Sequence, residues 1–326
     1  MGKAGALTGT GDFFVCDFLN PRPKHDLASM EHPIFSLATR PDRRILSYVH
    51  NDVEVTVTPS VRGRATIFDA DILIYCISQL MAALNAGREV ARTLTLTAHD
   101  LLLATGRETS GDAYRRLREA FERLAGTRIT TNIVTGETEV TTGFGLIEAW
   151  EIVRATRKGR MVSVRVTLSD WLYQAVLERS VLTLSRDYFR LRRPLERRLY
   201  ELARKHCGAQ PRWRVSVAVL AKKSGSSSPL RVFRAMLREI ALKDALPDYR
   251  FEEEGGDVFV VSRRNPRRPE QRAVLEQETL ALARTLAPGA DIYALEAEWR
   301  GLAAVSPPRD PDAAFLGWVK KRMAGT

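Results

Sequence analysis

The stretch LTLTAHDLLLATGRETSGDAYRRLREAFERLAGTRI, residues 94–129, decides the fold class of this chain. Thr97 can cap a short helix over Ala98–Ala104, because a threonine hydroxyl accepts a hydrogen bond from the first helical turn, and Gly106 can end it. A polar turn then leads into a second helix near Gly111–Ala125. Two helices joined by a short glycine-containing turn are typical of a helix-turn-helix unit.

Further elements flank this pair of helices. The apolar density of IFDADILIYCISQLMAAL, residues 67–84, predicts a helix buried on most sides, with Asp69 or Asp71 as its cap. After the pair, RITTNIVTGETEVTTGFGLIEAWEIV and MVSVRVTL alternate as strands do. Three helices followed by a hairpin are the order of a winged-helix domain, and we expect these strands to form the wing. Their turns are expected at Thr135-Gly136 and Lys158-Gly159.

The same order returns after residue 193. PLERRLYELARKHCG, residues 194–208, predicts a helix opened by Pro194, and shorter apolar periods predict helices at Val217–Lys223 and Leu230–Asp244. YRFEEEGGDVFVVSR then predicts a hairpin that turns at Gly255-Gly256. A shift of 119 residues superposes the two runs, which favours an internal duplication. The matched pairs are Gly106 with Gly225, Leu101 with Leu220, Tyr114 with Phe233, Leu117 with Met236, and Phe121 with Ile240.

These elements predict an α+β chain with two tandem winged-helix domains and a small helical C-terminal tail. Residues 1–30 are expected to be irregular, 31–182 to form the first winged-helix domain and 183–263 the second. The basic, proline-broken RRNPRRPEQR opens the tail, 264–326, in which we expect two or three helices, near 270–286, 291–303 and 312–323. Upstream, RILSYVHNDVEVTVTPS predicts a hairpin of Ile45–His50 and Val53–Thr58, turning at Asn51-Asp52.

Composition limits the partners. Lys and Arg number 50 against 39 Asp and Glu, and the net charge of +11 favours DNA, RNA or an anionic membrane surface. The longest apolar run, Ile72–Leu84, is too short to cross a bilayer. Cys16, Cys76 and Cys207 are scattered and form no metal-ligand spacing, so we expect reduced thiols, a cytoplasmic protein and no metal.

Enzyme signatures are missing from the sequence. There is no phosphate-binding GxxxxGK[ST] loop, no GxSxG and no HExxH. No His-hydrophobic-His pair could hold the metal of a nickase, so Tyr188 beside Asp187 is not expected to be a nicking nucleophile. We therefore expect a protein that is not an enzyme and needs no cofactor.

The helix at 111–125 carries the first set of candidate DNA-binding residues. Its apolar face has helical spacing and consists of Tyr114, Leu117, Phe121 and Leu124. Away from that face we place Arg115, Arg116, Arg118, Glu119 and Arg123. In a major groove, arginine can pair with guanine and glutamate with cytosine. The alternative is a solvated charged face stabilised by local Glu–Arg pairs.

The second helix repeats the arrangement. Phe233, Met236, Leu237 and Ile240 are expected to face inward, and Arg231, Arg234 and Arg238 outward, preceded by Lys222, Lys223 and Ser227. Two such helices in one chain favour DNA binding. Between the modules, the run Arg186–Lys205 has its densest basic cluster at Arg192, Arg193, Arg197 and Arg198, which could contact a DNA backbone or form a solvated helix face.

Four segments resemble the plasmid replication initiator protein A family: MEHPIFSL (30–37), VTPS (57–60), GRATIFDADILIYC (63–76) and LERRLYELARKHCG (195–208). The likeness runs from about residue 12 to residue 263. It implies tandem winged helices that bind repeated sites (iterons) at a plasmid origin, opening of AT-rich DNA, and recruitment of a host initiator, helicase and helicase loader. It also implies a dimer that represses its own gene, for which the hairpin Ile45–Thr58 is the candidate contact surface.

Two other functions stay open at this point. A winged-helix transcriptional regulator would bind a palindromic operator as a stable dimer, and autoregulation by an initiator would resemble it. A DNA-cleaving enzyme would need the metal-binding motifs that the sequence lacks.

Overall fold

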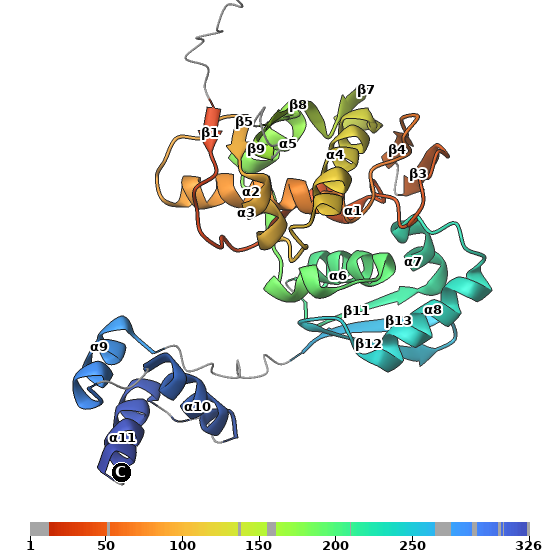
Figure 1. Cartoon of the computed structure of the whole chain (residues 1–326). Helices are drawn as coiled ribbons and strands as arrows, with labels where there is room; N and C mark the ends of the chain where they lie inside the picture. Colours follow the sequence, from red (N-terminus) through yellow and green to blue (C-terminus); the bar gives the residue numbers. More distant parts are fainter. Residues whose placement is uncertain are drawn as a thin grey trace, which may run out of the picture. The chain divides into compact units, whose positions relative to one another are not determined.

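The computed structural model describes residues 13–50, 53–135, 138–154, 161–208, 210–264, 275–288, 292–305, 308 and 310–324. The expected turns at Asn51-Asp52, Thr135-Gly136 and Lys158-Gly159 fall wholly or partly outside these residues, as do the start of the N-terminal segment and most of the basic linker. The chain forms two compact units, Met1–Arg263 and Arg264–Thr326, each described by itself (Figure 1).

The first module is built around a buried helix. Its helical elements and the short strand between them are α2 (Ala70–Asn85), β5 (Thr93–Leu96), α3 (Ala98–Ala104) and α4 (Gly111–Gly126). Thr97 caps α3 as predicted, and Ser110 caps α4 through the amide of Ala113. Asp69 stands at the start of α2 but does not cap it, because its carboxylate binds Arg123 instead.

The strands of the first module divide between two sheets. One sheet has the order β3-β4-β6-β7 and the other β1-β5-β9-β8. Their bounds are β1 (Phe13–Val15), β3 (Leu46–His50), β4 (Val53–Thr58), β6 (Arg128–Thr135), β7 (Thr138–Gly145), β8 (Ile147–Arg154) and β9 (Met161–Leu168). The sequence predicted that the strands after α4 form one wing. Instead, β8–β9 joins β5, and β6–β7 extends the upstream hairpin β3–β4.

The second module repeats the order of the first with one sheet. Its elements are α6 (Pro194–His206), β11 (Arg212–Ser216), α7 (Val217–Ser224), α8 (Leu230–Lys243), β12 (Tyr249–Gly255) and β13 (Val258–Arg263). The sheet order is β11-β13-β12. The starts of α3 and α7, and of α4 and α8, differ by the predicted 119 residues. Gly106 and Gly225 also share a φ of 65° in the turn between the two helices.

The N-terminal segment is more regular than expected. Residues 13–30 contain β1, which pairs in parallel with β5, then β2 (Lys24–Asp26) and the start of α1 (Leu27–Glu31). Strand β2 pairs with β10 (Val181–Thr183), which follows α5 (Asp170–Leu177). Strands of three residues give no detectable alternation, so their pairing could not be read from the sequence.

Each module has its own core, and the first reaches into the second. Met30 of α1 and Ile74 of α2 pack with Leu199, Phe233 and Phe259 of the second module. Between the modules, η1 (Arg186–Arg190) leads into α6.

In the described residues of the second unit there are three helices, where two or three were predicted: α9 (Gln277–Leu286), α10 (Ile292–Val305) and α11 (Pro311–Ala324). Trp299, Phe315 and Val319 are buried in its separate core. Within the described parts of the chain, no helix has the length and apolar content to cross a membrane.

Candidate nucleic-acid interface

Helix α4 presents three exposed arginines, as the sequence predicted. The side chains of Arg115, Arg116 and Arg118 are 69%, 72% and 56% exposed. Each is paired within the helix, Arg115 and Arg116 with Asp112, and Arg118 with Glu122 at 3.2 Å. Exposed pairs of this kind contribute at most about 1 kcal/mol, so a DNA phosphate or base can displace the carboxylate. The local pairs also fit the alternative of a solvated face.

Arg123 and Glu119 lie differently from the expected outward placement. Arg123 is only 18% exposed and holds Asp69 with both nitrogens of one edge, Nε at 2.7 Å and Nη2 at 2.8 Å. The hydrogen bonds to Asp69 raise the pKa of Arg123, although burial opposes this. This pair fastens α4 to the start of α2, and Arg123 is therefore not a free charge on the surface. Glu119 is half-buried.

Helix α8 carries the second set. Arg231 is exposed, and in the described part of the chain it has no ion-pair partner. Arg238 is 58% exposed and binds both oxygens of Glu253, at 2.8 and 2.7 Å, which lowers the pKa of that carboxyl. Arg234 is 27% exposed and pairs with Asp257. Two arginines of α8 are thus neutralised by the β12–β13 hairpin.

Two apolar side chains on α8 were missed by the sequence reading. Leu230 and Val232 are 48% and 49% exposed at the start of the helix. Apolar groups at this position suit contact with thymine methyl groups. The sequence shows both as large aliphatic residues that do not belong to the apolar face of the helix, and this could have marked them as exposed.

The residues that precede α8 differ in exposure and in their partners. Lys222 is exposed, and no ion pair is found for it among the described residues. Ser227 is exposed and accepts a hydrogen bond from Arg44 Nη2 at 3.2 Å. Lys223 was expected on the surface, but its side chain is only 6% exposed and pairs with Glu31.

Glu31 explains the burial of Lys223. Burial disfavours its charged form, but hydrogen bonds from His206, Lys205 and Lys223 outweigh burial and hold the pKa of Glu31 far below its usual range. The carboxylate, which lies at the end of α1, joins α6 to α7. Lys223 therefore serves the packing of the second module, since a buried ammonium needs a carboxylate.

Two of the four arginines in the basic cluster of the connector, Arg197 and Arg198, are buried and so are placed neither for a DNA contact nor on a solvated face. Arg197 is 3% exposed, with Nη1 2.5 Å from Asp71 Oδ1, and Arg198 is equally buried against Glu201. Arg193 is 45% exposed and pairs with Glu239 at 2.9 Å. Arg192 remains exposed and, within the described ranges, unpaired.

One groove lies beside the start of α4, and another lies between the turn before α8 and the second half of that helix. The first has a volume of about 780 Å³ and is lined by Ser110, Asp112 and Arg116 of α4 and by Arg40 and Arg192. The second, of about 500 Å³, is lined by Ser226–Ser228, Met236, Glu239, Arg44 and Arg64. The loop residues between α1 and β3 that line both grooves were not among the predicted site residues. The sequence feature that could have identified them is TRPDRR, in which three arginines flank a proline.

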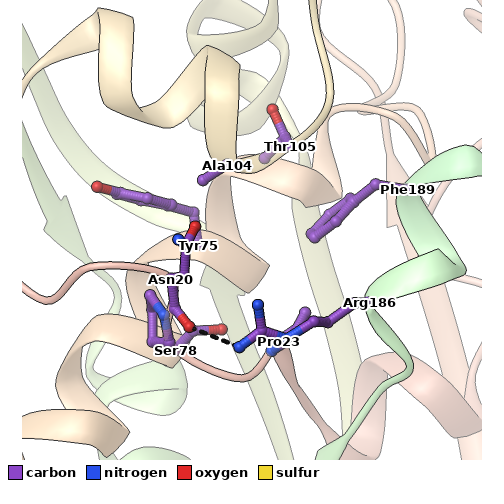
Figure 2. Close-up of a pocket in the computed structure, with 9 residues that line it drawn as sticks. Asn20, Pro23, Tyr75, Ser78, Ala104, Thr105, Arg186 and Phe189 are labelled. Atoms are coloured by element: carbon purple, nitrogen blue, oxygen red, sulfur yellow. Dashed lines mark hydrogen bonds between the residues drawn. The ribbon is translucent and has the colours of Figure 1, made fainter. Parts of the chain in front are cut away.

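A separate small pocket lies at the N-terminal segment. Figure 2 shows Asn20 and Ser78 on one side and Arg186 and Phe189 on the other. Its volume is about 110 Å³, and Arg186 Nη2 donates to the Asn20 carbonyl at 3.1 Å. Pockets that bind organic ligands are usually about 300 Å³ or larger, so we assign no ligand to it.

The duplicated order of three helices and a hairpin, with a basic third helix each time, defines a mixed α/β protein made of two related modules. The chain belongs to the replication initiator protein A family, whose profile matches residues 24–251.

Individual relatives agree with this family. A "Putative replication protein" of Wigglesworthia glossinidia brevipalpis is 38% identical over 243 residues, which cover 73% of this chain and 88% of the relative. Among solved structures, domains 2 and 3 of RctB superpose with a TM-score of 0.54 at 14% identity, covering 73% of this chain and 96% of the other. A second crystal structure of RctB domains 2-3 gives 0.49 at 14% identity, covering 72% and 95%. The first likeness shows a shared fold.

Proposed function

We propose that this chain initiates replication at a plasmid origin by binding repeated duplex DNA sites through two winged-helix modules. One observation carries the proposal: α4 and α8 occupy the same place in two modules, and each buries an apolar face while exposing arginines. Family membership supplies the role in replication initiation. The strand pairing supports the winged-helix interpretation, because in both modules the strand before the second helix pairs with the last strand of a hairpin.

Binding by two linked modules explains how one chain could recognise a long site. The second contact becomes intramolecular once the first is made, which raises its effective concentration. Bending of DNA across several sites would place strain on an AT-rich stretch and favour strand opening without nucleotide hydrolysis. We further propose that the opened origin recruits a host initiator, helicase and helicase loader, and that the protein acts in the cytoplasm.

Autorepression is part of the same proposal. A dimer would use the hairpin β3–β4, whose strand β3 is the outer strand of its sheet and pairs along only one edge with the strands that the structure describes. The competing proposal, a dedicated transcriptional regulator, predicts a stable dimer on one palindrome.

Footprinting on DNA that flanks the gene, at two salt concentrations, tests the function. Protection of several evenly spaced direct repeats that persists at the higher salt is expected. Protection of a single palindrome would favour the regulator. Binding everywhere that vanishes with salt would contradict sequence-specific initiation, because phosphate contacts alone have that salt dependence.

The pairs between α8 and its hairpin give a sharper test of the recognition helix. Arg234→Ala should weaken specific binding by about 1–3 kcal/mol if the guanidinium pairs with a guanine. Asp257→Asn should strengthen it, because the change frees Arg234 and removes a negative charge near the DNA. Asparagine also accepts the left-handed backbone of residue 257, whose φ is 63°. Equal effects on random DNA would instead indicate a phosphate contact.

We also propose that the protein is not an enzyme. Among the described residues, no group of three or more His, Cys, Asp or Glu side chains is placed to hold a metal ion. Supercoiled plasmid incubated with the protein and Mg²⁺ or Mn²⁺ should stay supercoiled, and metal-dependent nicking would contradict the proposal.

A further inference from the structure

The segment Thr39–Arg44, TRPDRR, is a basic loop between α1 and β3. All of its residues except Asp42 are exposed, including the three arginines. Arg44 is paired with Asp42, but within the described part of the chain neither Arg40 nor Arg43 has an ion-pair partner. Most arginines of α4 and α8 pair with carboxylates. By contrast, Arg40 and Arg43 of this loop carry positive charges that no carboxylate among the described residues neutralises.

The loop lies between the start of α4 and the turn that precedes α8. Thr39, Arg40 and Pro41 line the groove at the start of α4, whereas Asp42 and Arg44 line the groove beside α8. Arg44 also donates to Ser227, in the turn before α8. In Figure 1 the chain passes beside α7 on its way from α1 to β3. A duplex that contacts both helices would therefore pass close to this loop.

Hydrogen bonds to the buried Asp42 hold the loop in place. Asp42 is 8% exposed, and its carboxylate accepts from the Arg44 amide at 3.2 Å and from Nε and Nη2 of Arg44 at 2.9 Å each. The Arg64 amide donates to the Asp42 carbonyl at 2.8 Å. These bonds, led by the one from the Arg44 side chain, lower the pKa of Asp42. A preordered loop loses little conformational entropy when it binds.

Charge also favours the loop over the hairpin of the second module as a phosphate contact. The β12–β13 hairpin carries Glu252, Glu253, Glu254 and Asp257, each paired with an arginine, so the arginines there are matched by acidic groups. Behind the loop, Arg64 is 3% exposed; its Nη2 pairs with Asp42 at 3.3 Å, and in the described residues its Nε and Nη1 have no acceptor. The positive potential is thus displaced from the hairpin toward the loop.

We propose that Thr39–Arg44 contacts the phosphates of the duplex between the two major-groove segments that α4 and α8 enter. The proposal rests on the proposed function, because it places the duplex on both helices. Phosphate contacts position a protein on DNA and do not read the sequence. Arg40 and Arg43 would supply the contacts, and Arg44 would tie the loop to the turn before α8.

The experiment compares two variants that each lose two positive charges. Arg40→Gln with Arg43→Gln removes the proposed contacts. Arg88→Gln with Arg179→Gln is the control, since Arg88 follows α2 and Arg179 binds Asn85 at the end of α2. The start of α2 lines the groove beside α4, and a 16-residue helix is about 24 Å long, which separates the control from the loop. Affinity is measured against salt for the footprinted site and for random duplex.

The loop variant should lower the slope of log affinity against log salt by about 1.8, with equal loss of affinity on both duplexes, while the control keeps the wild-type slope. Thr39→Lys should raise the slope by about 0.9. An unchanged slope in the loop variant, or a loss confined to the specific site, would overturn the inference and leave the proposed function standing. Absence of any specific complex with the wild-type protein would instead overturn the proposed function itself.

Discussion

At the scale of single residues, ion pairing separates the arginines that serve the fold from those that face solvent. Arg197 and Lys223 are almost completely buried, and each has a carboxylate partner because an unpaired buried charge is too costly. Arg116 and Arg238 pair at the surface, where the carboxylate can be exchanged for a phosphate. The same residue type therefore has two roles in one chain.

Asp71 joins the first module to α6 of the second through its buried pair with Arg197, and its removal should be costly. It is 1% exposed and binds Arg197 Nη1 at 2.5 Å and Arg107 Nη2 at 2.9 Å. Asp71→Asn should lower the free energy of unfolding by about 3–5 kcal/mol, because Arg197 would remain buried without a counter-charge. Urea unfolding measures this. Asp112→Asn, which removes an exposed partner of Arg116, is the control and should stay close to wild type.

His32 should make stability depend on pH. Burial lowers its pKa to about 4 in the folded protein, against about 6.5 in an unfolded chain. The unfolded state therefore binds more protons between these values, and stability should fall as the pH drops from about 6.5 toward 4. Between pH 7 and 5.5 the loss from this group is up to about 1 kcal/mol.

His32→Gln should reduce this slope, measured by urea unfolding at both pH values. His99→Gln is the control, since the side chain of His99 is 50% exposed. An identical pH dependence in wild type and His32→Gln would contradict the assignment.

The candidate site was only partly predictable at this scale. The apolar faces of α4 and α8 have helical spacing, so Arg115 and Arg238 could be placed outside from the sequence alone. The burial of Arg123 and Lys223 could not be predicted in this way, because their partners Asp69 and Glu31 lie far away along the chain. Spacing within a helix says nothing about which distant carboxylate packs against it.

At the scale of elements, the two helix-turn-helix turns have the same backbone but different surroundings. Gly106 and Gly225 both have a φ of 65°, which disfavours any residue with a Cβ. A Cβ at Gly225 would meet Pro33 Cβ at 2.8 Å, whereas at Gly106 the nearest atom is 3.9 Å away, on Phe189. The second turn is packed against the first module, and the first turn is open.

Alanine at the two glycines should therefore differ in cost. Gly106→Ala should lower the free energy of unfolding by about 1–2 kcal/mol, the cost of a left-handed residue with a Cβ. Gly225→Ala adds a clash worth about 1–3 kcal/mol in a packed region, so its total should be clearly larger. Thermal or urea unfolding of both variants measures the difference, and equal losses would show that the contact with Pro33 relaxes freely.

Strand pairing was the least predictable feature at this scale. The alternation of β6, β7, β8 and β9 was evident in the sequence, but all four strands look alike in that pattern. Whether β6–β7 or β8–β9 pairs with β5 depends on how the whole core packs, and the alternation of the strands does not encode this. The result gives the upstream hairpin β3–β4 a partner in β6.

At the scale of the whole molecule, the chain consists of two units with separate cores. The first unit holds the cores of both modules, and all of their buried residues precede residue 264. The buried residues in the core of the second unit all lie at Leu275 or later. No described core residue is therefore shared, and the tail is expected to be dispensable for folding of the first unit.

A chain that ends at Arg263 should keep the urea unfolding transition of the first unit and the footprint of the full-length protein. A chain that ends at Asp248 is the control and should unfold, because it loses β12 and β13 with the buried Phe251 and Phe259. A changed footprint for the chain ending at Arg263 would assign the tail a part in DNA binding.

The sequence by itself determined helices α2–α4 and α6–α8, the cap at Thr97, the 119-residue repeat and the family, because these depend on local periodicity and on residues close together in the chain. Only the tertiary structure decided which charges are free. It buried Arg197 against Asp71, neutralised Arg234 with Asp257, and left Arg40 and Arg43 of the TRPDRR loop without a carboxylate partner among the described residues. The physical reason is that an ion pair depends on distance in space, and the chain brings its partners together only when the cores pack.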